Sequence, residues 1–138
     1  PPYFNDVWRS RDGARWELVT AAAGWSPRPG HRCEAIVGSI VCFGGFGLPP
    51  AGNPRDAWAS RNGKDWKQVS DAPWNATSGE QIKYDFAALS TWDWDRGPVP
   101  AIYTFGGDRE TFDFTDPMNP FRVDNDVWRF SPRGAGGR

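Results

Sequence analysis

The chain has 138 residues, close to the usual size of one domain, and 38% of them are hydrophobic. Its sixteen Gly and thirteen Pro exclude long helices, and its 15% of aromatic residues excludes a disordered chain. Sixteen basic and seventeen acidic side chains nearly cancel, which argues against nucleic-acid binding, and the longest apolar run, Ala35–Phe43, is too short for membrane insertion. The composition therefore predicts a turn-rich, all-β protein.

Two strands are predicted within residues 3–19, on either side of Asp12-Gly13, a dipeptide that suits a tight hairpin turn. The stretch Asn5–Trp8, followed by a second tryptophan eight residues later, returns at an offset of 50 residues as Arg55–Trp58 and Trp66. A third copy begins at Asp124–Trp128. A repeat of this length that is built from short strands is typical of a β-propeller, in which each repeat forms one four-stranded blade.

A complete four-stranded meander is predicted within residues 28–69. Its first two strands, His31–Val37 and Ile40–Phe43, are β-rich runs on either side of Gly38-Ser39, which we expect to form the two-residue turn. Its last two strands flank Asn62-Gly63, where the first copy has an Asp-Gly pair. The Gly-Gly pair after Phe43 marks a position where a close neighbour or a sharp bend leaves no room for a Cβ.

The remaining sequence, residues 79–132, predicts the first three strands of a further unit. Its Thr104–Gly107 matches Cys42–Gly45 from 62 residues earlier, since both end in Phe-Gly-Gly. Residues 133–138 are rich in Gly and Arg and are expected to form a flexible tail.

These motifs resemble Kelch-type β-propeller repeats over residues 3–132. The resemblance rests on Phe-Gly-Gly at the end of one strand, Asn-Asp-Val-Trp on the next, a Trp on the fourth, and Pro27–His31 before the following blade. The Ser-x-Asp-Gly-x-x-Trp stretch is also similar to the Asp-box of sialidase-like propellers, but it is one residue shorter. The resemblance implies an incomplete ring of four-stranded antiparallel meander blades.

The units add up to about two and a half blades: strands c and d in residues 3–19, a complete blade in 28–69, and strands a, b and c in 79–132. Propellers close with roughly four to eight blades. Because open sheet edges favour unwanted pairing, we expect the remaining blades to come from a longer chain or from other chains. The partners expected from this count are the remaining blades of the same propeller or other proteins.

The two cysteines lie on the first two strands of the complete unit. With Gly38-Ser39 as the turn, Cys33 faces Gly44 and lies diagonal to Cys42, near the limit of about 7 Å between Cα atoms that a disulfide spans. The pair forms either a disulfide or two small buried side chains. Asn75 begins an Asn-Ala-Thr sequon, and together with a disulfide it would indicate a secreted glycoprotein, extracellular or in the lumen of the secretory pathway; a cytoplasmic location is the alternative.

A long connection, residues 108–123, is one candidate for binding a partner. Its candidate anchors are Phe112, Phe114 and Phe121, although these rings would also suit packing back on the blade. The carboxylates Asp108, Asp113 and Asp116 are weak calcium candidates, because the register of an EF-hand is absent.

A second candidate lies in the turn 91–98. Trp92, Trp94 and Arg96 are of the residue types that anchor a protein partner or stack on a sugar. Alternate strand residues point to the same side, so both indoles are expected on one face. Packing between blades is the other interpretation of these tryptophans.

The sequence favours a non-catalytic protein-interaction or structural module. The alternative is a segment of a carbohydrate-binding or carbohydrate-active propeller that is galactose-oxidase-like or sialidase-like. A galactose-oxidase-like copper site requires two His and two Tyr, whereas this chain has a single His, so no metal or other cofactor is expected. Sialidase-like catalysis requires an Arg cluster, a Tyr nucleophile and a carboxylate, and nothing in the sequence brings the available candidates together.

Overall fold

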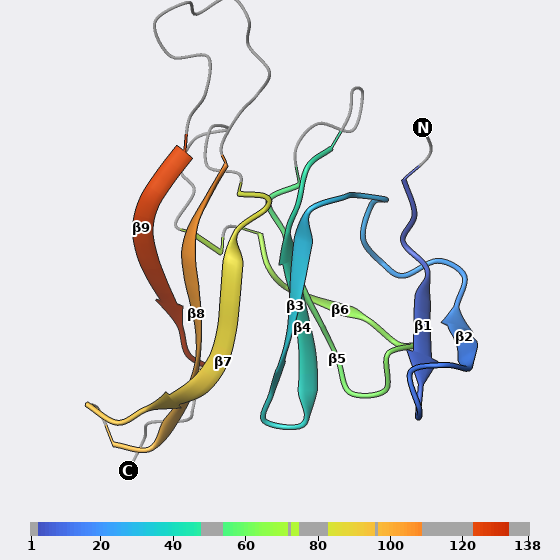
Figure 1. Ribbon diagram of the computed structural model, residues 1–138, viewed down its shortest axis with the longest axis horizontal. Helices are drawn as coiled ribbons and strands as arrows, with labels where there is room; N and C mark the ends of the chain where they lie inside the picture. Colours follow the sequence, from blue (N-terminus) through green and yellow to red (C-terminus); the bar gives the residue numbers. More distant parts are fainter. Residues whose placement is uncertain are drawn as a thin grey trace, which may run out of the picture.

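The computed structural model describes residues 3–47, 54–71, 73–74, 83–95, 97–108 and 123–132. These residues form nine strands in three antiparallel sheets and contain no helix, which confirms the all-β expectation. The three sheets lie one after another along the long axis of the molecule (Figure 1). Among the described residues, no sheet closes on itself.

Each sheet is a meander in which neighbouring strands follow one another in the sequence. The N-terminal sheet contains β1 (Val7–Ser10) and β2 (Trp16–Thr20). The central sheet contains β3 (His31–Ile36), β4 (Ser39–Gly44), β5 (Ala57–Ser60) and β6 (Lys67–Ser70). The C-terminal sheet contains β7 (Ala87–Asp93), β8 (Val99–Asp108) and β9 (Val123–Phe130).

The β3–β4 hairpin corrects the expected register. Its turn is Val37-Gly38 and not Gly38-Ser39, because Ile36 pairs with Ser39. Both turn residues have positive φ, 48° and 69°, which matches the right-handed twist of the flanking strands. The shift of one residue places Cys33 directly opposite Cys42, and no longer opposite Gly44.

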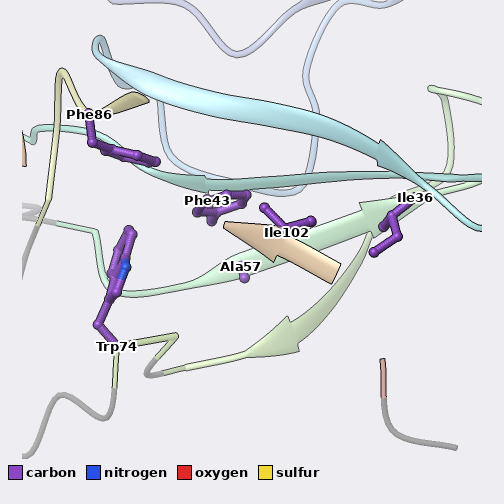
Figure 2. Close-up of a cluster of buried hydrophobic side chains, with 6 residues drawn as sticks. All are labelled: Ile36, Phe43, Ala57, Trp74, Phe86 and Ile102. Carbon is purple, nitrogen blue, oxygen red and sulfur yellow. The ribbon is translucent and has the colours of Figure 1, made fainter. Parts of the chain in front are cut away.

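The larger hydrophobic core lies between the central and C-terminal sheets. Figure 2 shows its six buried side chains, which are Ile36, Phe43, Ala57, Trp74, Phe86 and Ile102. The ring of Trp74 meets that of Phe86 edge to face, with 5.4 Å between centroids, and lies 5.9 Å from that of Phe43. Trp74 follows β6 and Phe86 precedes β7, so this aromatic contact joins the end of one sheet to the start of the next.

A smaller core joins the N-terminal and central sheets. Trp25, which follows β2, is buried together with Ala23 and Cys42. The indole of Trp25 lies edge-on to Trp66, with 4.4 Å between ring centroids. Trp25 and Trp74 therefore occupy equivalent places: Trp25 lies between the N-terminal and central sheets, and Trp74 lies between the central and C-terminal sheets. This agrees with their offset of 49 residues.

Gly44 is expected to tolerate no side chain. A Cβ at Gly44 would lie 2.5 Å from the ring of Phe86 and 2.8 Å from the carbonyl oxygen of Lys83, at a φ of 74°. Gly38 is the matched control, because its φ of 69° is similar and a Cβ added there would meet nothing within 4 Å. Gly38→Ala should cost about 1–2 kcal/mol for the left-handed backbone alone. Gly44→Ala should cost about 1–3 kcal/mol more from overpacking, as measured by urea unfolding; equal losses would contradict this packing.

Candidate interaction sites

A carboxylate–indole hydrogen bond recurs in all three sheets. The indole nitrogen of Trp8 donates to Asp6 Oδ2 at 2.6 Å, that of Trp58 to Asp56 at 2.8 Å, and that of Trp128 to Asp126 at 2.6 Å. In each case the carboxylate is two residues before the indole. Asp6 and Asp56 immediately precede β1 and β5, whereas Asp126 lies within β9. We call each of these pairs an Asp–Trp corner.

Two of the three Asp–Trp corners are completed by a buried cation. Arg28 Nη1 lies 2.5 Å from Asp56 Oδ1 and 3.4 Å from the carbonyl oxygen of Gly44. Lys83 Nζ lies 2.5 Å from Asp126 Oδ1 and 3.2 Å from the carbonyl oxygen of Gly106. Both cationic side chains are only 3% exposed. Each cation therefore links the start of its hairpin, the Gly-Gly pair that ends it, and the next strand.

The charge network around Arg28 affects the pKa of Asp56. Burial by itself raises the pKa of this carboxyl, but hydrogen bonds from Arg28 and Trp58 and the charge of Arg28 act against it. Their combined effect is larger, so the pKa of Asp56 is lowered from its ordinary value of 3.8. Asp56 is therefore ionised at neutral pH and remains paired with Arg28.

The single histidine also has a structural contact. His31 Nδ1 lies 3.2 Å from the carbonyl oxygen of Arg28, to which it donates. Burial lowers the pKa of His31 from 6.5, and the charges of Arg28 and Arg32 lower it further, while the hydrogen bond opposes the shift. His31 is thus neutral at pH 7 and helps to hold the chain segment that positions Arg28.

The sequence interpretation did not identify Lys83. A signal for it is present, because Arg28 and Lys83 each lie three residues before a ring residue at the entry to the next strand. His31 is the first residue of β3, and Phe86 immediately precedes β7. The intervening residues Gly30 and Asp85 share a positive φ, 67° and 50°. The two segments match at an offset of 55 residues, whereas the Gly-Gly pairs match at 62, since the second hairpin is longer.

The turns after β1 and β5 also repeat each other. The backbone N–H of Gly13 donates to Ser10 Oγ at 2.8 Å, and that of Gly63 donates to Ser60 Oγ at 2.9 Å. Asp12 Oδ1 accepts from the backbone N–H groups of Ala14 and Arg15, and these bonds lower the pKa of Asp12. Asn62 Oδ1 accepts from the equivalent two N–H groups in the second turn. The Ser-x-Asp-Gly stretch thus has a local role in shaping its hairpin.

Cys33 and Cys42 form a disulfide, with 4.1 Å between their Cα atoms. The Phe-Gly-Gly match places Thr104 where the first hairpin has Cys42, and Ala88, the partner of Thr104, where it has Cys33. Trp74 donates to Thr104 Oγ1 at 3.4 Å, whereas the indole nitrogen of the equivalent Trp25 has no hydrogen-bond partner within the described part of the chain. The disulfide therefore replaces a hydroxyl acceptor with a poorly accepting sulfur.

Trp92 lies near the end of β7 and Trp94 lies in the β7–β8 turn, and these residues are 52% and 73% exposed. Between them, Asp93 is buried, forms an ion pair with Arg129 and accepts from the backbone N–H of Asp95 at 3.2 Å. The backbone N–H of Gly97 donates to the carbonyl oxygen of Trp94 at 3.3 Å. Two exposed indoles are thus carried by a turn that is fixed from inside the sheet. β7 ends at Asp93, so Trp94 lies beyond the strand on which the alternation argument was based.

Several candidates lie outside the described residues. These are Arg96, the sequon residue Asn75, the ring positions Phe112, Phe114 and Phe121, and the calcium candidates Asp113 and Asp116. Asp108 is described and is half-buried at the end of β8, where its backbone exchanges hydrogen bonds with Tyr84. In the described segments, no three His, Cys, Asp or Glu side chains are grouped closely enough to hold a metal ion.

A groove of about 740 Å³ lies between the central sheet and the end of the C-terminal sheet. Val69 and Ser70 of β6 line one side, and Phe130 and Pro132 line the other. In the central sheet β6 pairs with β5, whereas β9, which is the counterpart of β5, pairs only with β8 among the described strands. The groove therefore lies beside the position that a fourth strand of the C-terminal sheet would occupy.

The two end sheets carry exposed apolar side chains. On the N-terminal sheet these are Trp8, Trp16 and Leu18, with Phe4 just before β1. On the C-terminal sheet they include Leu89, Phe105, Val123 and Val127. Trp8 and Leu18 are cross-strand partners, as are Phe105 and Val127, so each group contains side chains on one face of its sheet. Apolar groups of this kind are typical of surfaces that are covered in an assembly.

No protein-family model and no curated protein matches the chain. The part of the chain that the structure describes includes no helix with the length and hydrophobicity of a membrane-spanning segment. The repeated geometry of the sheets is therefore the main basis for assigning a role.

Asp56→Asn should destabilise the protein much more than Asp6→Asn. Loss of the Asp56 charge leaves Arg28 buried without its counterion, at a cost of about 3 kcal/mol, whereas the exposed Asp6 should cost about 0.5 kcal/mol or less. Because the pKa of Asp56 is lower in the folded chain than in the unfolded chain, its contribution is full well above pH 3.8 and is lost as the pH falls further.

Urea unfolding from pH 6 to pH 3 measures both effects of Asp56. The difference in the free energy of unfolding between the wild type and Asp56→Asn should shrink as the pH falls below the ordinary carboxyl pKa of 3.8. A difference that is independent of pH, or equal losses for the two variants, would contradict the assigned ion pair.

In the β7–β8 hairpin, Ala88 and Thr104 occupy the positions of Cys33 and Cys42. Placing Ala and Thr at positions 33 and 42 therefore tests whether a hydroxyl there accepts a hydrogen bond from Trp25, as Thr104 does from Trp74. Cys33→Ala/Cys42→Ala should lose about 2–3 kcal/mol, the loop-closure contribution of a short disulfide loop. Cys33→Ala/Cys42→Thr should recover about 1 kcal/mol of that loss, because the hydroxyl accepts from Trp25. Urea unfolding without reductant compares the two variants, and a threonine variant no more stable than the alanine variant would rule out the hydrogen bond.

Proposed function

We propose that the chain is part of a Kelch-type β-propeller and serves as a non-catalytic protein-interaction or structural module. The observation that carries this proposal is the repetition of the Asp–Trp corner in three successive sheets, two of which are closed by equivalent buried cations. A unit that repeats its hydrogen bonds as well as its sequence is what a propeller requires, because each blade must pack on its neighbour in the same way.

The use of the buried charges supports a non-catalytic role. Arg28 and Lys83 are held by carboxylates and glycine carbonyl groups, and Asp93 is held by Arg129. Each of these groups joins strands of its own sheet. A catalytic acid, base or nucleophile instead needs a reactive atom that faces a substrate.

Trp92 and Trp94 are the proposed contact with a protein partner. Their indoles are exposed, while the ion pair of the buried Asp93 with Arg129 fixes the end of β7 and the start of the turn, which carry them. Rigidly held aromatic side chains bury a large area and lose little conformational freedom on binding, which is the reason they dominate protein interfaces.

The Cys33–Cys42 disulfide favours an extracellular protein or one in the lumen of the secretory pathway. Disulfides persist in oxidising compartments and are rare in the cytosol, where thiols are kept reduced. The sequon at Asn75 is consistent with the same route, and glycosylation there remains part of the proposal.

Site-specific photo-crosslinking tests the contact. A photoreactive amino acid at Asp95, beside the two indoles, should cross-link a defined polypeptide in cells that naturally produce the protein, whereas the same group at the exposed Lys64 should not. Trp92→Ala/Trp94→Ala should reduce the product about 30-fold, as expected for the loss of two anchor residues.

The outcomes distinguish the two candidate ligands. No adduct at Asp95, or an adduct that the double substitution leaves unchanged, would overturn the protein-binding role. Saturable binding of a glycan that is abolished by the same double substitution would instead support the carbohydrate-binding alternative.

A further inference from the structure

The Asp–Trp corner of the N-terminal sheet differs from the other two in one respect. Asp6 Oδ2 accepts the indole N–H of Trp8, as Asp56 and Asp126 do for their own tryptophans. In the other two corners Oδ1 receives a buried cation, whereas no cation among the described residues pairs with Asp6, which is exposed. The first corner thus has the acceptor geometry but lacks its cation.

The two complete corners define where such a cation comes from. In both, it stands three residues before a ring residue that leads into a β-hairpin, and an aromatic-Gly-Gly sequence lies at the end of the second strand of that hairpin, within one residue of the last strand residue. The second strand pairs antiparallel with the strand that follows the carboxylate. Phe43 lies opposite Ala57, and Phe105 lies opposite Val127, so the aromatic residue always faces the position between the Asp and the Trp.

The corresponding edge of the N-terminal sheet is unpaired among the described strands. β1 pairs with β2, and no other described strand pairs with its opposite edge. By the offset of 50 residues, Val7 corresponds to Ala57 and Trp8 to Trp58. Trp8 is 49% exposed, whereas its counterpart Trp58 is partly buried against Trp25 in the smaller core.

We infer that the free edge of β1 binds a β-hairpin of the same repeat type, whose leading Arg or Lys pairs with Asp6 Oδ1. The aromatic residue before the Gly-Gly pair of this hairpin lies opposite Val7, and the residue before that aromatic lies opposite Trp8. The bound hairpin converts the two-stranded sheet into a four-stranded sheet that matches the central one. The inference rests on the repeat geometry of the proposed function but is independent of Trp92 and Trp94.

Charge and backbone pairing both specify this occupant. An unpaired strand edge offers a row of N–H and C=O groups to any extended chain, which by itself gives little selectivity. Asp6 adds the selectivity, because a cation held at this corner also reaches the carbonyl oxygen of the first glycine, as Arg28 and Lys83 do. A hairpin without the leading basic residue would leave that part of the site unfilled.

A fusion that supplies the hairpin in the same chain tests the inference. Residues 26–54 are duplicated in place of residues 1–4, so that the added copy leads into Asn5 through the connection that leads naturally into Arg55. Urea unfolding is then measured for this fusion, for Arg28→Met in the added copy alone, for Asp6→Asn, and for both substitutions together. Glu17→Gln, which removes an exposed carboxylate from β2 of the same sheet, replaces Asp6→Asn in a control cycle.

The double-mutant cycle should show that the added Arg28 and Asp6 are coupled. We expect a coupling of about 10- to 100-fold in the unfolding equilibrium constant, the range for a hydrogen-bonded charge pair, and none between the added Arg28 and Glu17. Absence of coupling with Asp6 would overturn the inference. Trp92→Ala/Trp94→Ala in the fusion should leave the coupling unchanged, so failure here and failure of the proposed protein contact are separate results.

A second measurement keeps the inference testable if the fusion does not fold. The oxidised peptide of residues 26–47 is titrated into the nitrogen-15-labelled full chain, and the Trp8 indole resonance is followed. A saturable shift that is weakened about 10-fold or more by Asp6→Asn supports the inference. No shift, or a concentration-dependent self-association of the chain without peptide that Asp6→Asn abolishes, would overturn it, since the second result assigns the edge to another copy.

Discussion

The rest of the fold depends on a buried cation held by a carboxylate that also accepts a tryptophan N–H. Arg28 and Lys83 each cost free energy to remove from water, and that cost is offset only where a carboxylate and a glycine carbonyl group are placed together. The requirement fixes three chain segments relative to one another: the start of the hairpin, its Gly-Gly end and the next strand. In the central and C-terminal sheets the meander is therefore determined by the contacts of one buried cation as well as by the ladder of hydrogen bonds.

The glycine pairs and the aromatic core follow from that contact. Close approach of Gly44 to Phe86 and to the backbone of Lys83 is possible only without a side chain, and it brings Phe86 onto Phe43 and Trp74. The buried charge of Lys83 and the aromatic cluster around Phe86 thus belong to one contact region between the central and C-terminal sheets. The disulfide is a local variation on the same plan, because Cys33 and Cys42 occupy the places of Ala88 and Thr104.

The proposed binding positions lie where this pattern is incomplete or where it ends. Trp92 and Trp94 are exposed at the end of β7 and in the turn after it, which the Asp93–Arg129 ion pair holds. Asp6 has the geometry of an Asp–Trp corner, but no cation in the described part of the chain pairs with it. A scaffold made rigid by repeated internal contacts is well suited to presenting such positions, since binding then requires little reorganisation. The geometry of the repeat thus determines which charged and aromatic side chains are buried and which remain exposed for binding.

The sequence by itself determined the all-β class, the periodic tryptophans and the positions of the strands, because turn residues and repeated aromatic positions are local signals. It predicted the wrong β3–β4 turn, since Val37-Gly38 and Gly38-Ser39 are both compatible with a two-residue turn and the side chains on the two faces decide the register. It also missed Lys83, whose partners Asp124 and Asp126 lie more than forty residues away. Only the tertiary structure decided the β3–β4 register and the partners of Lys83. The pairing of a buried charge depends on which distant strands pack together, and a local sequence pattern does not contain that information.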